Sequence, residues 1–128
     1  MIGMRITGKK LGILGMGRIG QAIAKRAKAF DLDINYHNRR RLHQIVEEGL
    51  SATYWESLEE MLSTIDILVV SASLNPSSLY LLNAKCLGRM KPTAYLVNIS
   101  RGEIIDQKAL VRQLKDGQLG GAGLDVYD

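Results

Sequence analysis

The sequence predicts an α/β domain of three layers, in which a doubly wound parallel sheet lies between two layers of helices. Short apolar runs of strand length alternate along the chain with segments whose apolar residues recur at helical spacing. The run 66–71 is β-branched and almost continuously apolar, as expected of a central strand buried on both faces. A glycine-rich turn at 15–20 joins the first apolar run to the first helical segment. No repeat or low-complexity stretch interrupts this pattern, so we expect residues 1–128 to form one compact domain.

The first half of the chain is expected to contain three strands, at 11–14, 34–38 and around 52–54. A helix begins at Arg18, and its predicted apolar face consists of Ile19, Ala22, Ile23, Ala27 and Phe30. A short helix follows the second strand and stops at Gly49, and its predicted apolar residues are Leu42, Ile45 and Val46. Ser57 and Glu60 form a capping-box pattern that opens a third helix, whose apolar residues are Met61, Leu62 and Ile65.

The second half continues the alternation, with strands expected at 66–71, 94–98 and 121–126. Asn83 is placed to cap a helix that runs to about Met90, and Pro92 ends it. Asp106 is placed to cap the last helix, which ends at Gly117. The predicted apolar residues of this last helix are Leu110, Val111 and Leu114.

The composition is that of a soluble globular domain, with 46% hydrophobic and 23% charged residues. No apolar run approaches the ~20 residues that span a bilayer, and the N-terminus has no signal-peptide pattern. We therefore expect a cytoplasmic protein without membrane attachment. The one cysteine, Cys86, excludes an internal disulfide and is expected to be buried on a helix. His37 and His43 are not accompanied by further ligand residues, so we expect no metal site.

The formal net charge is +4, and the densest group of cations is the arginine triplet at 39–41, directly after the second predicted strand. A basic balance is compatible with nucleic acid or with an anionic small ligand. Only 5% of the residues are aromatic, which leaves little surface for stacking on bases. We therefore expect an anionic small ligand and no nucleic acid.

The glycine-rich turn has the spacing Gly15-x-Gly17-x-x-Gly20 between an apolar strand and an amphipathic helix, where this pattern binds a dinucleotide in a Rossmann-type fold. Gly15 permits a tight turn, Gly17 lets a pyrophosphate approach the backbone, and Gly20 lets the helix pack on the strand. The backbone N–H groups of Arg18 and Ile19 are expected to face the anion at the positive end of the helix dipole. The alternative is a purely structural glycine-rich turn.

The end of the second strand predicts which dinucleotide is preferred. A carboxylate at this place accepts hydrogen bonds from the adenosine ribose of NAD. This sequence has Asn38 instead, followed by Arg39 and Arg40. An amide carries no charge that would repel a 2′-phosphate, and guanidinium groups pair with phosphate strongly. We therefore predict that NADP(H) is preferred and that NAD(H) can also bind. The alternative is a solvated basic loop.

Three motifs resemble those of the D-isomer-specific 2-hydroxyacid dehydrogenases. The segment 9–20 is similar to the family's opening motif, 96–106 to its signature and 121–126 to the motif that follows, and 90–92 also fits. The segment 37–40 most resembles the glyoxylate/hydroxypyruvate reductase branch, whose members often favour NADPH. The resemblance implies the nicotinamide-dinucleotide-binding domain of an oxidoreductase. Such an enzyme transfers a hydride between NADP(H) and a small D-2-hydroxy acid or 2-oxo acid.

The resemblance also implies roles for individual residues. Arg101 matches the family's catalytic arginine, which binds the carboxylate and carbonyl of a 2-oxo acid and polarises the carbonyl for hydride attack. Asp125 matches the residue that binds the nicotinamide carboxamide. Ser73 stands where the family usually has a proline, which leaves the local shape of that loop open. The predicted cofactor-binding residues are Gly15, Gly17, Arg18, Ile19, Gly20, Asn38, Arg39, Arg40, Ser71, Ala72, Ile99, Ser100 and Asp125.

In the family, the acid–base histidine and its supporting glutamate lie past the position of Asp128, and the substrate domain is built from both ends of a longer chain. The resemblance therefore implies that residues 1–128 are the middle portion of an enzyme and are inactive alone. Neither His37 nor His43 is in a position to replace that histidine. Because some relatives act as corepressors, a non-catalytic dinucleotide-binding module is the alternative. Full-length relatives commonly dimerise through this domain, so a homodimer is expected.

Overall fold

The computed structural model describes residues 7–72, 80–100 and 104–124, which contain a six-stranded parallel sheet. The strands are β1 (Lys10–Leu14), β2 (Asp33–His37), β3 (Thr53–Tyr54), β4 (Ile67–Val70), β5 (Tyr95–Asn98) and β6 (Gly121–Leu124). The helices are α1 (Arg18–Ala29), α2 (Gln44–Gly49), α3 (Leu58–Thr64), α4 (Ala84–Leu87) and α5 (Gln107–Lys115). The strand order is β3-β2-β1-β4-β5-β6, and every neighbouring pair is parallel. The predicted doubly wound sheet is confirmed.

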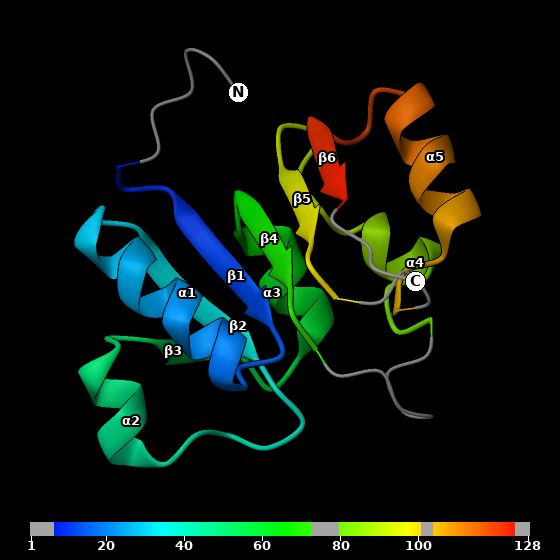
Figure 1. Cartoon of the computed structure of the whole chain (residues 1–128). Coiled ribbons are helices and arrows are strands. Elements are labelled where there is room, and N and C mark those ends of the chain that lie inside the picture. The colour runs from blue at the N-terminus through cyan, green and yellow to red at the C-terminus, as the bar shows by residue number, and fades with distance from the viewer. Residues whose placement is uncertain (1–6, 73–79, 101–103, 125–128) are drawn as a thin grey trace.

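Helices cover both faces of the sheet, and Figure 1 shows α1 in front of the strands and α3 behind them. One buried cluster packs α3, α4 and α5 against a face of the sheet and includes Met61, Leu87 and Leu110 together with Leu68 of β4. A second cluster packs α1 against the opposite face and includes Val69, the next residue of β4. Successive strand residues point to opposite faces, so β4 is buried on both sides. This arrangement confirms the three predicted layers.

The buried face of α1 differs from the predicted one. Its buried residues are Gly20, Ala24 and Ala27. Only Ala27 of the predicted face is buried, Ile23 is half-buried, and the exposed members are Ile19, Ala22 and Phe30. A Cβ at position 20 would overlap the carbonyl oxygen of Gly15. The helix therefore lies so close to the sheet that small residues, and not the larger apolar ones, form its inner face.

The apolar faces predicted for α2 and α5 are also partly wrong. In α2, Ile45 is 74% exposed and Val46 is 38% exposed, whereas Glu47 is buried. In α5, Leu110 of the predicted face is buried, but Val111 and Leu114 are exposed. Gln113 is buried there instead, and its side-chain amide donates to the carbonyl oxygen of Leu87 at 2.8 Å. In both helices a polar side chain with a defined hydrogen-bond partner takes an inner position that apolar periodicity alone does not predict.

The helix starts follow the sequence closely. The side-chain oxygens of Ser57, Asn83 and Asp106 each accept a hydrogen bond from the backbone N–H three residues later, at 3.2, 3.0 and 3.2 Å. The predicted caps are therefore confirmed, although α4 ends at Leu87 and is shorter than expected. Cys86 is buried and unpaired, as predicted. None of the helices in the described ranges has the length and hydropathy needed to span a membrane.

Candidate dinucleotide-binding site

The predicted turn lies where the connections of the sheet reverse direction. β1 and β4 are neighbours in the sheet, although β2 and β3 separate them in the sequence. The chain continues from β1 toward one edge of the sheet and from β4 toward the other. The carboxyl ends of two such strands are where doubly wound sheets bind ligands. Gly15 directly follows β1 and Ser71 directly follows β4, so both residues lie at this position.

Gly15 makes the tight turn after β1 with a φ of +91°. Its N–H donates to the carbonyl oxygen of His37 at 3.0 Å. A Cβ at this position would lie 2.5 Å from the backbone nitrogen of Ala72. The left-handed backbone and this close neighbour both require glycine. The hydroxyl of Ser71 donates to the carbonyl oxygen of Gly15 at 2.6 Å, so the segment after β4 supports the turn from the opposite side.

Gly17 is the N-cap of α1 and has an extended backbone, with φ of −81° and ψ of −158°. Among the described residues, a Cβ there would meet nothing within 4 Å beyond its chain neighbours, and no side chain caps this end of the helix. The N–H of Gln21 donates to the carbonyl oxygen of Gly17 at 2.9 Å. The N–H groups of Arg18 and Ile19 precede this bond and have no partner within the helix. Open space beside donors that have no partner within the helix, at the positive end of α1, fits a pyrophosphate.

Asn38 connects the glycine turn to the three arginines at 39–41, which we call the basic segment. Its Oδ1 atom accepts a hydrogen bond from the N–H of Met16 at 3.1 Å, inside the turn. Its Nδ2 atom donates to the carbonyl oxygen of Arg40 at 3.0 Å. One amide therefore fixes both the turn and the start of the basic segment, a role that charge reasoning alone does not predict. Arg39 and Arg40 are both exposed, as binding to a phosphate group requires.

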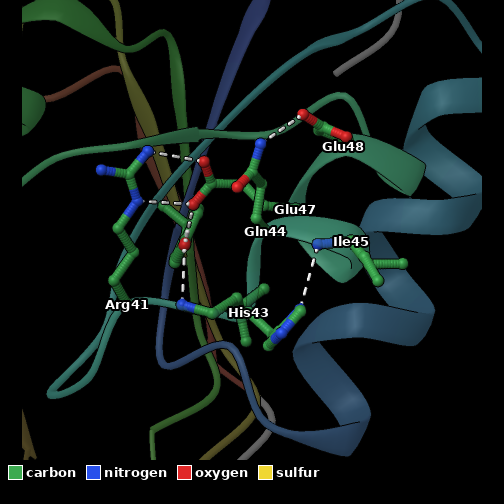
Figure 2. Close-up of polar contacts among 8 residues, drawn as sticks. Arg41, His43, Gln44, Ile45, Glu47 and Glu48 are labelled. Atoms are coloured by element: carbon green, nitrogen blue, oxygen red, sulfur yellow. Dashed lines mark hydrogen bonds and ion pairs between the residues drawn. The ribbon is translucent and has the colours of Figure 1, made fainter.

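Arg41, the third arginine of the triplet, is occupied by an ion pair. Its Nε and Nη2 atoms contact the two carboxylate oxygens of Glu47 at 3.0 and 2.8 Å (Figure 2). The hydroxyl of Tyr36, in β2, donates to the same carboxylate at 2.5 Å. That hydroxyl also accepts a hydrogen bond from the N–H of Leu42 at 3.0 Å. The guanidinium of Arg41 lies 5.4 Å from the ring centroid of Tyr54. Sequence reasoning missed this network, which we call the Glu47 network.

The Glu47 network lowers the pKa of Glu47 and raises the pKa of Tyr36. The hydrogen bonds from Arg41 and then from Tyr36 lower the pKa of Glu47 to about 2. Burial, followed by the hydrogen bond to Glu47, raises the pKa of Tyr36 to about 12. Near neutral pH the carboxylate is therefore ionised and the phenol is neutral, which is the combination that the hydrogen bonds require.

Acid is expected to weaken the fold through Glu47. Its folded pKa of about 2 lies below the ordinary 4.5, so its contribution is complete above pH 4.5 and is lost as the pH falls through about 2. Glu47→Gln removes the titrating group. The free energy of unfolding, measured by denaturant at pH 7 and pH 3, should therefore fall less in this variant than in the wild type. An equal fall in both proteins would contradict the assignment.

The end of β5 contributes the other half of the predicted site. Ile99 donates through its N–H to the carbonyl oxygen of Val70 at 3.0 Å, beside the end of β4. Ser100 donates through its N–H and its hydroxyl to Oδ1 of Asn98, at 2.9 and 2.8 Å. Asn98 is fully buried, and its Nδ2 atom has no hydrogen-bond partner among the described residues. Arg101 and Asp125, for which the family resemblance implies the main chemical roles, lie outside the described residues.

Both histidines of the chain make local structural contacts. Nδ1 of His37 lies 2.8 Å from the carbonyl oxygen of Trp55. Nδ1 of His43 accepts a hydrogen bond from the N–H of Ile45 at 3.2 Å and so caps α2 (Figure 2). His37 ends β2 and His43 caps α2, so neither residue belongs to β4, β5 or the segments that follow them.

In the comparison with known proteins, the whole chain matches one family model. Residues 1–128 match the D-isomer specific 2-hydroxyacid dehydrogenase, NAD binding domain. The chain is 47% identical over 127 residues to a glyoxylate reductase from Pyrococcus furiosus. That match covers 99% of this chain and 37% of the relative. The chain thus spans little more than a third of the length of the curated relatives it matches.

Solved structures give the same result for the fold. A glyoxylate reductase from Paecilomyes thermophila is 44% identical with a TM-score of 0.90, and the match covers 99% of this chain and 38% of that one. A D-mandelate dehydrogenase from Rhodotorula graminis, in its apo form, is 32% identical with a TM-score of 0.93. That second match covers 98% of this chain and 36% of the other. These two neighbours are named for different substrates, so the shared domain does not by itself determine the substrate.

Proposed function

Because the chain belongs to the D-isomer specific 2-hydroxyacid dehydrogenase family, as its NAD binding domain, we propose that it holds NADP(H) in a reductase of small 2-oxo acids. Glyoxylate and hydroxypyruvate are the proposed substrates, and the 47% identity to a glyoxylate reductase supports this choice. The single observation that carries the cofactor proposal is the position of Arg39 and Arg40. They are exposed directly after an asparagine that is hydrogen-bonded to the glycine turn.

The proposed cofactor site extends from the glycine turn to the basic segment. The N–H groups of Arg18 and Ile19 would hold the pyrophosphate beside Gly17, where open space lies at the positive end of α1. Arg39 and Arg40 would pair with the 2′-phosphate of the adenosine ribose. Asn38 brings no negative charge to this place, and its two hydrogen bonds keep the turn and the basic segment together. NAD(H), which lacks the 2′-phosphate, would bind more weakly.

The remaining site residues have proposed roles at the reacting end. A nicotinamide cofactor, when bound, supplies the hydride for reduction of a carbonyl group. Arg101 would hold the carboxylate and carbonyl of the 2-oxo acid through its planar guanidinium, and Asp125 would bind the carboxamide. The main chain at Ile99 and Ser100 would line the same pocket. The homodimer and the cytoplasmic location stay predictions.

Residues 1–128 on their own are expected to bind NADPH without oxidising it. The reaction needs a proton donor beside the carbonyl, and both histidines of this chain make structural contacts around β2 and α2. Absorbance at the nicotinamide band, followed in the presence of NADPH and glyoxylate, should stay constant. Measurable glyoxylate reduction by this chain would contradict the proposal. In an enzyme that contains this domain, equal efficiency with NADPH and NADH would contradict the proposed cofactor preference.

A further inference from the structure

The basic segment is attached to the body of the domain at both of its ends. At the first end, Asn38 binds the N–H of Met16 and the carbonyl oxygen of Arg40. At the second end, the N–H of Leu42 donates to the hydroxyl of Tyr36 at 3.0 Å. Arg39 and Arg40 lie between these two attachments. The second attachment is part of the Glu47 network, whose carboxylate binds both Tyr36 and Arg41.

The following inference rests on the proposed NADP(H) preference. We propose that Glu47 is a positioning residue for the 2′-phosphate site, because it fixes the end of the segment that carries Arg39 and Arg40. The carboxylate does not itself contact the phosphate group. It acts through Tyr36 and Arg41, which it holds by three hydrogen bonds of 2.5 to 3.0 Å.

The contacts of Arg41 separate its role from that of its two neighbours. Its guanidinium makes a bidentate pair with Glu47 and lies over the ring of Tyr54. The carboxylate balances the positive charge of Arg41 and occupies its Nε and Nη2 donors. Arg39, Arg40 and Arg41 are all exposed, and the side chain of Arg41 is 63% exposed. What separates Arg41 is its bidentate pair with Glu47, which makes it a structural anchor. The triplet divides into two ligand arginines and one anchoring arginine.

The burial of Glu47 supports a positioning role. Glu47 is 9% exposed, although its neighbours Ile45 and Val46 on the same short helix point outward at 74% and 38%. A buried carboxylate is costly unless it is paired, and both oxygens of this one accept hydrogen bonds. α2 thus places a charged residue inward and apolar residues outward. The inward position of Glu47 adds hydrogen bonds that hold the basic segment, where an apolar residue would add only buried surface.

Electrostatics and positioning make opposite predictions for a neutral residue at position 47. The negative charge of Glu47 lies close to the basic segment, so its removal would strengthen phosphate binding if charge alone mattered. Removal would also release Arg41 as a further ligand. If Glu47 instead fixes the segment, its removal frees the segment to move and weakens phosphate binding. The sign of the change therefore separates the two explanations.

The decisive experiment compares Glu47→Gln with Glu48→Gln. Both variants remove one negative charge from α2, but Glu48 is exposed, and among the described residues its Oε1 accepts only from the Gln44 amide, at 3.0 Å (Figure 2). Binding of NADPH and NADH is measured by fluorescence titration. Glu47→Gln should raise the Kd for NADPH about tenfold and change the Kd for NADH by less than about twofold. Glu48→Gln should leave both constants within about twofold of the wild type. Unchanged or tighter NADPH binding by Glu47→Gln would overturn the inference.

Tyr36→Phe provides a second variant that keeps the buried ring and removes only the hydroxyl. It deletes the attachment at Leu42 and the hydrogen bond to Glu47 without altering the charge of the chain. Its Kd for NADPH should rise about threefold or more, with NADH unaffected, and this variant decides the matter if Glu47→Gln does not fold. A wild type that prefers NADH would overturn the proposed cofactor and this inference together. A wild type that prefers NADPH, with Glu47→Gln and Tyr36→Phe unchanged, would overturn this inference alone.

Discussion

Replacing Gly17 with alanine is expected to remove dinucleotide binding while leaving the fold intact. The backbone of Gly17 is extended, and a Cβ there meets none of the described residues within 4 Å apart from its chain neighbours, so alanine fits the free chain. The same methyl group would occupy the open space in which the pyrophosphate approaches the helix. Each charge-assisted hydrogen bond that is lost removes about 1.5–3 kcal/mol of binding free energy, so the Kd for NADPH should rise roughly 10- to 100-fold or more. Fluorescence titration measures this change, and thermal unfolding should show a Tm close to that of the wild type.

Gly15→Ala is the matched control, because it also adds one methyl group to the same turn. Its Cβ would lie 2.5 Å from the backbone nitrogen of Ala72, and its φ of +91° is unfavourable for alanine. Overlap with backbone and left-handed strain together should cost roughly 2–5 kcal/mol of unfolding free energy. Gly15→Ala should thus lower the Tm, whereas Gly17→Ala should lower affinity alone. Wild-type affinity in Gly17→Ala would refute the assignment of the turn to pyrophosphate.

The second large effect is expected for the double variant Arg39→Ala/Arg40→Ala. Each arginine is expected to make a charge-assisted contact with the 2′-phosphate, which contributes about 1.5 kcal/mol or more. Loss of both should raise the Kd for NADPH about 100-fold. NADH has no 2′-phosphate, so its Kd should change by less than about threefold. Titration of the double variant with both cofactors measures the two constants.

Arg26→Ala/Arg112→Ala controls for the loss of two positive charges. Both of these arginines are exposed, in the last turns of α1 and α5, away from the basic segment in the sequence. This variant lowers the net charge equally, so long-range attraction of a phosphate falls to a similar extent. Its Kd for NADPH should stay within about threefold of the wild type. Equal losses in the two double variants would assign the effect to overall charge and would exclude a defined 2′-phosphate site.

The strands were predictable because their burial is encoded locally. β4 is an uninterrupted apolar run, and its residues Leu68 and Val69 enter different cores on the two faces. The caps Asn83 and Asp106 were also predictable, since a side-chain oxygen three residues before a free N–H is a local feature. The inner face of α1 was not. The glycine turn brings α1 close to β1, so only small residues fit between them. Apolar periodicity predicts larger residues on that face, because it contains no information about this distance.

The site was predictable where it depends on backbone conformation. The spacing of Gly15, Gly17 and Gly20 indicated three different requirements, and the structure assigns a distinct environment to each glycine. The Glu47 network was missed because three consecutive arginines look equivalent in a sequence. A signal was nevertheless present: the buried strand residue Tyr36 needs a partner for its hydroxyl. Only the tertiary structure identifies that partner as Glu47, a residue of the helix that follows.

The most direct test of the proposed cofactor site is a fluorescence titration of this chain with NADPH and, in parallel, with NADH. The glycine turn should bind the pyrophosphate of both, and Arg39 and Arg40 should add affinity for the 2′-phosphate alone. We predict saturable binding of both cofactors, with a Kd for NADPH at least about tenfold lower than that for NADH. Equal affinity for the two, tighter binding of NADH, or no binding of either would contradict the proposed NADP(H) site.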